Sequence, residues 1–372
     1  MNASVLDAGE RELLRDGFRR FSRERAGCEV HAPDDQDATQ VIREEWRRLA
    51  QQGWLSLGLP DTFGGYGLSI GDLGLLMRAA GEGRWRAPLV ECLGEACGVL
   101  LVAPPSGARD GLLARIVAGE AIVGVVGAGD GTDNVAFDVT ATGGRFHVTG
   151  ARKFVTAGHA LTHLLLTARG GPAQDDALYL LETSALGVQW RNYPTLDQRC
   201  AGDLTLDDVE AERLAEGHLS LKAARDRGHL LAAAEVLGIA QAAFDSTRRH
   251  LADRHQFGQP LLAFQAIQHR LVNLYVSLRE LAALLEVVQA AYDVDHPDIE
   301  RLLWKLRAQA SLTGRQVTQE SIQLHGGMGM TAEMPAGDYY KRVMQIDSLY
   351  GSREWALDRL AETLVMQGRA AR

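Results

Sequence analysis

The spacing of apolar residues changes twice along this chain of 372 residues, and that change limits the folds it can adopt. From about residue 7 to 118, apolar residues recur at helical intervals, beginning with Leu13, Leu14, Phe18 and Phe21. From about 120 to 213, β-branched residues alternate or run together between glycines, as in FHVTGARKFVTAG. From about 216 onward the spacing is helical again. This order predicts an α+β fold with an antiparallel β unit between two helical units.

The same patterns predict domain boundaries and individual elements. We expect an N-terminal all-α domain over 1–118, a middle β-barrel or β-sandwich domain over 119–214, and a C-terminal helical bundle over 215–372. One face of a long helix in the last region is formed by Phe264, Ile267, Leu271, Leu274 and Leu278. Near the end of the middle region, Leu204, Leu206 and the following Asp-Asp-Val alternate as in an edge strand.

Net charge and composition exclude several classes of protein. The chain carries 39 Lys and Arg against 48 Asp and Glu, a formal charge of −9, whereas nucleic-acid and anionic-membrane surfaces require a basic face. No apolar run approaches the roughly 20 residues that span a bilayer, and the N-terminal MNASVLDAGERELLRD lacks the regions of a secretory signal. The four cysteines, Cys28, Cys92, Cys97 and Cys200, have no CxxC spacing. We expect a cytoplasmic protein with reduced thiols, no metal site, and neither a nucleic-acid nor a membrane partner.

The glycine-rich segment VVGAGDGTD at 125–133 is similar to a dinucleotide-binding fingerprint but lacks two of its features. Gly127-x-Gly129 is not followed by the third glycine, because position 132 is Thr. The next residues, NVAFDVTA, have the pattern of a strand, whereas a dinucleotide-binding loop must open a helix. The segment is better explained as a loop between strands, whose glycines let backbone N–H groups approach a ligand.

Five segments, in order over about residues 50 to 360, carry a resemblance to one family. The two most specific are Arg254-His-Gln-Phe257-Gly258 with Phe264-Gln265, and Gln323-Leu-His-Gly326-Gly327-Met-Gly329. The others are Gly-Trp54-Leu with Phe63-Gly-Gly-Tyr-Gly, then Gly129-x-Gly131-Thr132-Asp133, and Phe154-Val155-Thr156. Together they resemble the signatures of acyl-CoA dehydrogenases, which are FAD-dependent oxidoreductases acting on acyl thioesters. The resemblance implies an N-terminal helical domain, a middle antiparallel β domain and a C-terminal four-helix bundle.

The resemblance also implies FAD as the cofactor and assigns contacts to it. Phe154 would shield one face of the flavin, and Thr156 would bond to its ring. Arg254 would form bidentate hydrogen bonds with the diphosphate, and Gly326-Gly327 would let backbone N–H groups approach it. The implied cofactor-binding residues are Arg254, Phe257, Phe264, Gln265, Gln323, Gly326, Gly327, Phe154, Thr156, Thr132 and Ser352. In this interpretation Arg254, Phe257 and Gln265 act from one subunit and Gln323 to Gly327 from its neighbour, which implies a dimer of dimers.

Each of these residues also fits a plain structural role. Arg254 could cap a helix or pair with Asp253, Phe257 and Phe264 could be core, and the glycines could simply end a helix. Five ordered matches favour the cofactor site for Arg254, Gln323 and the paired glycines. For Phe257 and Phe264 both interpretations stay open.

The position of the catalytic base departs from the family pattern. Acyl-CoA dehydrogenases remove a proton beside the thioester carbonyl with a carboxylate in a Tyr-Glu-Gly-Thr segment, while a hydride leaves for the flavin. Here the segment reads Leu-Tyr350-Gly-Ser, so Tyr350 stands in place of the glutamate. A phenol has a reference pKa of about 10 and costs roughly 4 kcal/mol to ionise at pH 7, which makes it a poor base and a good hydrogen-bond donor. A shifted register would make Glu354 the base, and Asp226 and His229 flank a second base position at Gly228.

A second departure from the family pattern is Val126-Gly127-Ala128, which replaces the family's Thr-Glu-Pro. Three hypotheses fit both departures. The first is a dehydrogenase of acyl-CoA or a carrier-bound acyl group, either with a relocated base or as one subunit of a heteromer whose homologous subunit carries the glutamate. The run around Tyr350 looks closest to such small-subunit chains. The second is a flavin-dependent oxygenase or oxidase on the same scaffold, and the third is a non-catalytic subunit. The electron acceptor would be an electron-transfer flavoprotein or O₂.

Overall fold

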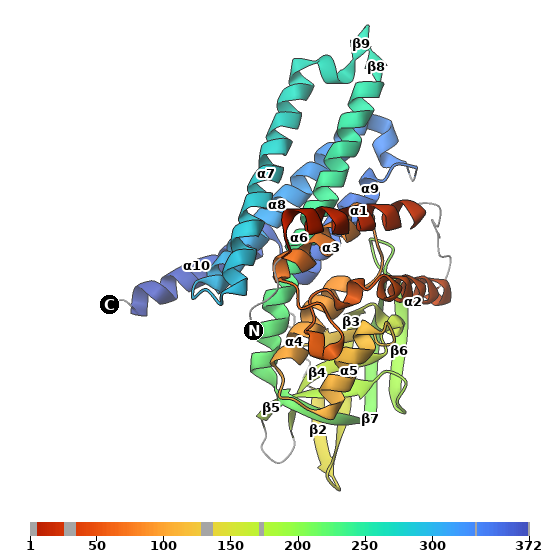
Figure 1. The fold of residues 1–372 in the computed structure, drawn as a ribbon, viewed down its shortest axis with the longest axis vertical. Helices are drawn as coiled ribbons and strands as arrows, with labels where there is room; N and C mark the ends of the chain where they lie inside the picture. Colours follow the sequence, from red (N-terminus) through yellow and green to blue (C-terminus); the bar gives the residue numbers. More distant parts are fainter. Residues whose placement is uncertain (1–5, 26–34, 128–136, 171–174, 332, 371–372) are drawn as a thin grey trace. The chain divides into compact units, whose positions relative to one another are not determined.

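A computed structural model describes residues 6–25, 35–127, 137–170, 175–331 and 333–370 (Figure 1). The chain divides into two compact units, each assembled from separated segments. Unit 1 contains residues 1–6, 28–69 and 86–228, and unit 2 contains residues 7–27, 70–85 and 229–372. Among the residues described, no helix combines the length and hydropathy that crossing a bilayer requires.

Helices of the N-terminal region are shared between the two units. Unit 1 takes α2 (Asp35–Gln51), α4 (Cys97–Val102), α5 (Gly107–Val117), η1 (Trp54–Ser56), η2 (Asp61–Phe63) and η3 (Val90–Ala96). Unit 2 takes α1 (Ala8–Arg25) and α3 (Ile70–Glu82), which the Arg11–Asp72 ion pair joins at 2.8 Å. Phe18 and Phe21 are buried as their spacing predicts. Leu13 is 74% exposed, because it falls outside the helix face that these two residues define.

Unit 1 is built around a seven-stranded sheet. Its strands are β1 (Val123–Val126), β2 (Phe137–Thr142), β3 (Arg145–Thr156), β4 (His163–Gly170), β5 (Asp175–Glu182), β6 (Val188–Pro194) and β7 (Cys200–Glu216). Pairing runs β4–β2–β3–β7–β5 and returns from β5 to β4, so these strands close into a ring, with β1 added to β4 and β6 to β7. Among the described strands, five of these seven pairings are antiparallel, and β1–β4 and β2–β4 are parallel. The predicted α+β class is confirmed.

Strand β7 is not an edge strand, contrary to the prediction. One of its edges pairs with β3, and the other pairs first with β6 and then with β5. Leu204, Leu206 and Val209 are buried, as their alternation predicts. Alternation records which face of a strand is buried and carries no information on whether both of its edges are paired.

The long helices of unit 2 carry the two most specific sequence segments. They are α7 (Gln265–Asp293), α8 (Ile299–His325), α9 (Ala336–Tyr350) and α10 (Arg353–Ala370), and α6 (Gly217–Asp253) enters the unit at His229. Burial of Leu271, Leu274 and Leu278 confirms the predicted face of α7. Helices α3 and α6 approach closely at Gly81 and Gly238, where an added Cβ would lie 2.3 Å and 2.0 Å from backbone oxygens of the facing helix.

A buried ion pair joins α6 to α9 inside unit 2. Arg342 donates from Nε and Nη2 to the two carboxylate oxygens of Glu235, at 2.7 and 2.8 Å. The two side chains are 8% and 3% exposed. Because both charges are removed from water, each one depends on the other for its stabilisation.

We predict that Arg342→Met lowers the free energy of unfolding by about 3–5 kcal/mol, because the buried Glu235 carboxylate loses this cation. The double variant Arg342→Met with Glu235→Leu should regain most of that loss, since it removes both charges. Arg359→Met breaks the exposed Arg359–Glu362 pair and should cost about 1 kcal/mol or less. Urea denaturation followed by circular dichroism measures all three, and an Arg342→Met variant no less stable than Arg359→Met would contradict this prediction.

Candidate cofactor-binding and active site

Arg254, Phe257 and Gln265 lie on and beside a hairpin that joins α6 to α7. Strands β8 (His255–Gln256) and β9 (Gln259–Pro260) form the hairpin, and η5 (Leu261–Ala263) follows it (Figure 1). The turn residues Phe257 and Gly258 have φ values of 53° and 82°, as a two-residue hairpin turn of this type requires. Phe257 is 90% exposed at the tip, with its ring edge-on to that of Phe264 at 6.2 Å. The alternative that Phe257 belongs to the core is therefore wrong for this chain, while Phe264 is half-buried.

The side chain of Arg254 is exposed beside this hairpin. Its backbone is fixed, because its N–H donates to the carbonyl of His250 at 2.9 Å and its carbonyl accepts from Leu261 at 2.8 Å. Within the described part of the chain the guanidinium has no ion-pair partner, so the alternative of a pair with Asp253 is not observed. An arginine whose backbone is fixed and whose guanidinium is exposed is suited to binding an anionic ligand.

Gln323, Gly326 and Gly327 lie where α8 ends in the short helix η6 (Gly326–Met330), and all three are exposed. Gly326 has a φ of 62°, and its N–H donates to the carbonyl of Gln323. A Cβ on either glycine would meet no described atom within 4 Å. Gly329 is different, because a Cβ there would lie 2.4 Å from the Ile322 carbonyl oxygen. Gly329 therefore serves packing, whereas Gly326 and Gly327 leave space for a ligand to approach the backbone.

The two segments meet at one end of the helices of a single chain. The hydroxyls of Thr247 on α6 and Ser321 on α8 share a hydrogen bond of 2.7 Å. The rings of His250 and His325 stack with centroids 4.5 Å apart. The segments that we predicted to reach a cofactor from two different subunits thus also lie side by side within one chain, because α6 and α8 both end here. Sequence spacing gives no information on which helix ends coincide.

This junction fits the diphosphate of FAD. It combines the exposed guanidinium of Arg254, the exposed amide of Gln323 and the open backbone at Gly326 and Gly327. Charge-assisted and backbone N–H donors of this kind bind phosphate oxygens. Gln265 is exposed at the first position of α7, and the N–H groups of Ile267 and Gln268 in that turn donate to the Phe264 carbonyl at 2.9 and 3.0 Å. Bound FAD supplies a hydride acceptor, and these residues of the chain would hold and orient it.

In unit 1, strand β3 presents Phe154 on a distorted stretch of its backbone. The register against β7 shifts at this point, and Phe154 has a φ of 58°, which is uncommon for an aromatic residue. Asp203 holds the distortion, because its Oδ1 accepts from the Phe154 N–H at 3.2 Å and from the Tyr193 hydroxyl at 2.9 Å. Burial, together with this carboxylate, raises the pKa of Tyr193 to about 12, so its hydroxyl stays a donor. Phe154 is thereby left 38% exposed on a rigid strand, with Thr156 half-buried two residues on.

Thr132 lies outside the described residues, together with the rest of 128–136. The described residues on either side of this segment are the strands β1 and β2. They agree with a loop between two strands and not with a dinucleotide-binding loop that opens a helix.

Tyr350 is the last residue of α9 and is 6% exposed. Its ring lies edge-on to that of His229, with centroids 5.9 Å apart. His229 also contacts the rings of Trp304 and Trp355, at 5.0 and 6.1 Å. The phenol is therefore held in an aromatic cluster formed by α6, α8, α9 and α10.

The turn after Tyr350 is fixed by a buried polar cluster that sequence analysis missed. Arg307 donates from Nε to the Gly351 carbonyl at 2.8 Å and pairs through Nη2 with Asp347. Ser311 donates to Asp347 Oδ2 at 2.8 Å, and Arg315 pairs with the same oxygen. Burial lowers the pKa of Arg307, and the Asp347 carboxylate opposes that shift. The signal in the sequence was a stripe of polar residues at i, i+4 and i+8 on an otherwise apolar face of α8.

The other predicted candidates for the base form hydrogen bonds or ion pairs with neighbouring residues. Ser352 accepts from the Trp355 N–H at 3.3 Å and donates to Glu354 Oε2 at 2.9 Å, so both residues contribute to the start of α10. The pKa of Glu354 is lowered by its own backbone N–H and by Ser352, which is the opposite of what a base near neutral pH needs. Asp226, in unit 1, pairs with Lys222 and lies 3.7 Å from Arg225.

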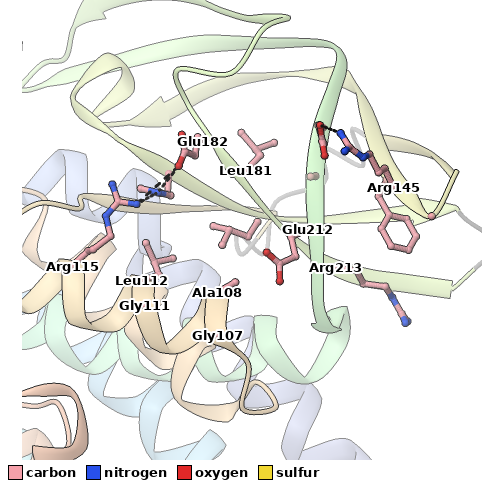
Figure 2. Close-up of a pocket in the computed structure, with 16 residues that line it drawn as sticks. Gly107, Ala108, Gly111, Leu112, Arg115, Arg145, Leu181, Glu182, Glu212 and Arg213 are labelled. Carbon is pink, nitrogen blue, oxygen red and sulfur yellow. Dashed lines mark hydrogen bonds and ion pairs between the residues drawn. The ribbon is translucent and has the colours of Figure 1, made fainter. Parts of the chain in front are cut away.

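A cavity of about 650 Å³ in unit 1 lies between α5 and the sheet, and none of the predicted residues lines it. Figure 2 shows Arg115 pointing toward Glu182 at its edge, 4.0 Å apart, with His163 3.1 Å from the same guanidinium. Arg145 pairs with Glu210 at 3.1 Å on another wall. Because these charges offset one another, the cavity offers no net attraction for the anionic parts of FAD or CoA.

Comparison with known proteins identifies the family of this chain. Residues 8–120 match the family model of the acyl-CoA dehydrogenase N-terminal domain, and residues 216–365 match that of the C-terminal domain. Benzylmalonyl-CoA dehydrogenase of Aromatoleum aromaticum is 24% identical over 354 residues, which cover 90% of this chain and 92% of the relative. Acyl-CoA dehydrogenase FadE28 of Mycobacterium tuberculosis is 27% identical over 334 residues, covering 87% and 93%.

A solved structure of the Tcur3481-Tcur3483 steroid ACAD is similar with a TM-score of 0.83 and 28% identity, covering 97% of this chain and 99% of that one. The two family models together match most of the chain. The predicted family, fold and FAD cofactor are thereby confirmed. This chain belongs to the acyl-CoA dehydrogenase family of FAD-dependent oxidoreductases.

Proposed function

We propose that this chain is the base-poor subunit of a heteromeric acyl-CoA dehydrogenase. It binds FAD at the junction of Arg254 with Gly326-Gly327, and a homologous chain that carries the glutamate supplies the proton-abstracting site. The observation that carries this proposal is the buried phenol of Tyr350 at the end of α9, in the place of the family's carboxylate. Removing the proton beside a thioester carbonyl needs a base that is ionised at neutral pH, and a phenol is not.

Neighbouring carboxylates of the described chain do not replace the missing base. Asp347 lies near Tyr350 in sequence, but its two oxygens already bind Arg307, Ser311 and Arg315. With both of its oxygens engaged by donors of α8, this carboxylate serves to fix the structure. Tyr350 is therefore left as a hydrogen-bond donor or a wall of the acyl site.

A second chain is supported by the exposed hairpin of unit 2. Phe257 is 90% exposed and Arg254 is exposed beside it. An aromatic ring fixed in this way is suited to packing against a cofactor or a partner chain. The similar steroid ACAD carries the names of two gene products, Tcur3481 and Tcur3483, in agreement with a pair of unlike chains.

The acyl group we propose is one that bears a ring, attached to CoA. Two of the similar proteins, benzylmalonyl-CoA dehydrogenase and the steroid ACAD, are named for substrates of this kind. An electron-transfer flavoprotein is the proposed acceptor of the electrons. Oxygen uptake with an oxygenated product would instead assign the chain to the oxygenases of the same scaffold.

Arg254→Ala tests the cofactor site. The change removes a charge-assisted hydrogen bond worth roughly 1.5–3 kcal/mol, so the Kd for FAD should rise about 10–150-fold. Arg249→Ala is the control, because Arg249 is an exposed arginine of the same helix outside the motif. Fluorescence quenching of FAD by apoprotein measures both, and equal affinity in the Arg254→Ala variant and the parent would place the site elsewhere.

Assembly should be linked to FAD, because residues of a second chain are expected to cover the hairpin around Phe257. Removing FAD should therefore shift the sedimentation profile toward smaller species, and adding FAD back should reverse the shift. A monomer that holds one FAD per chain at low protein concentration would rule out a second chain that covers the bound cofactor.

Tyr350→Glu restores the carboxylate of the family and tests the missing base. The variant alone should gain bleaching of its flavin by a saturated acyl-CoA under nitrogen, whereas Tyr350→Phe should change the rate of the heteromer by about 2–12-fold, as one neutral hydrogen bond of 0.5–1.5 kcal/mol implies. Ser348→Glu is the control, since it adds a carboxylate at an exposed position two residues away. No bleaching by a folded, FAD-loaded Tyr350→Glu variant would show that the missing glutamate is not the sole block.

A further inference from the structure

We propose that His250 and His325 form a proton-binding part of the FAD site, in which the bound diphosphate draws one proton onto the stacked imidazole pair. This inference rests on the proposed placement of FAD at Arg254 and Gly326-Gly327. It adds two residues that neither sequence motif requires, and it links cofactor affinity to pH.

The two histidines directly adjoin the two motif segments. The ring planes of His250 and His325 are 26° apart, with centroids at 4.5 Å. His250 is on the last turn of α6, where its carbonyl accepts from the Arg254 N–H, and His325 is the last residue of α8, immediately before Gly326. The imidazoles therefore join the cation and the glycines that would surround the diphosphate.

The hydrogen bonds of His325 define its tautomer. His325 is 5% exposed, and its Nδ1 lies 2.7 Å from the Ser321 carbonyl, so Nδ1 carries a hydrogen and donates it. In the neutral ring Nε2 is then an acceptor, and it is buried with no hydrogen-bond partner in the described part of the chain. A proton on Nε2 would turn this unsatisfied acceptor into a charged donor, which an anion nearby would stabilise.

Without a ligand the surroundings oppose such a proton. Burial lowers the pKa of His250, His325 and Arg254 lower it further, and only Asp253 raises it. Two further charged groups near this end, Arg270 on α7 and Glu320 on α8, pair at 2.5 Å and offset each other. Two stacked imidazoles also repel each other when both are charged, so we expect one proton on the two rings and not two.

A diphosphate beside Arg254 reverses this balance. Its negative charge favours the protonated form and raises the pKa of His250, which the empty site holds low. Between the pKa values of His250 without and with FAD, binding takes up a proton, so the affinity for FAD should increase as pH falls through this window. Above the window His250 is neutral with and without FAD, and the affinity should no longer depend on pH through this group.

Calorimetric titration of the full-length apoprotein with FAD tests the proposal, when performed in two buffers that differ in ionisation enthalpy. We expect uptake of about half a proton or more near pH 6 and about a tenth or less near pH 8. His325→Gln and His250→Gln should each lose at least about half of the uptake near pH 6 while still binding FAD. His296→Gln, which changes an exposed imidazole after the far end of α7, should keep the parental value.

Full proton uptake in a folded His325→Gln variant and in His250→Gln would overturn the proposal while leaving the cofactor site intact. Unchanged FAD affinity in Arg254→Ala would instead contradict the proposed cofactor site, on which this inference rests. Circular dichroism shows whether His325→Gln folds. If it does not, His250→Gln alone decides the test, because His250 is only half-buried.

Discussion

The buried carboxylate of Asp347 fixes the part of unit 2 in which Tyr350 lies. Its oxygens bind two arginines and a serine of α8, and one of those arginines also holds the carbonyl of Gly351. Helix α9 is thereby tied to α8 at the residue where it ends. Because the turn that follows has a φ of 87° at Gly351, the direction of the chain into α10 is set at the same point. The arrangement places the Tyr350 phenol at the end of α9 and engages the Asp347 carboxylate in structural bonds.

Two exposed aromatic residues in left-handed backbone conformations mark the regions that we connect with FAD. Phe257, at the hairpin turn of unit 2, has a φ of 53°, and Phe154, on the distorted strand of unit 1, has a φ of 58°. Such backbone conformations cost about 1–3 kcal/mol each and persist where the surrounding structure enforces them. In both places the result is a large apolar ring presented to solvent, which stability alone does not require. A flavin needs flat apolar surfaces of this kind, whereas its diphosphate needs a cation such as Arg254, which directly precedes the hairpin of Phe257.

Sequence analysis predicted the features that local periodicity and motifs determine. The buried faces of α1 and α7, the strand pattern of the middle region and the family were all accessible, because each depends on residues close in the chain or on an ordered set of motifs. The features it missed depend on which distant segments meet. Alternation in β7 could not show that both of its edges are paired, and helical spacing could not show that α1 and α3 pack in the same unit as the C-terminal helices. The sequence did not show that the ends of α6 and α8 meet and bring two motifs side by side. It also did not show that the polar stripe of α8 faces Asp347.

The central claim is that Arg254 with its hairpin and Gln323 to Gly327 form one cofactor site on a single chain. Hydrogen–deuterium exchange of the apoprotein, with and without FAD, tests it most directly. We predict that FAD slows exchange in two separate peptides, one covering residues 254–265 and one covering residues 323–330. Protection confined to α5 and the strands that line the cavity of unit 1, with no change at residues 254–265 or 323–330, would contradict it.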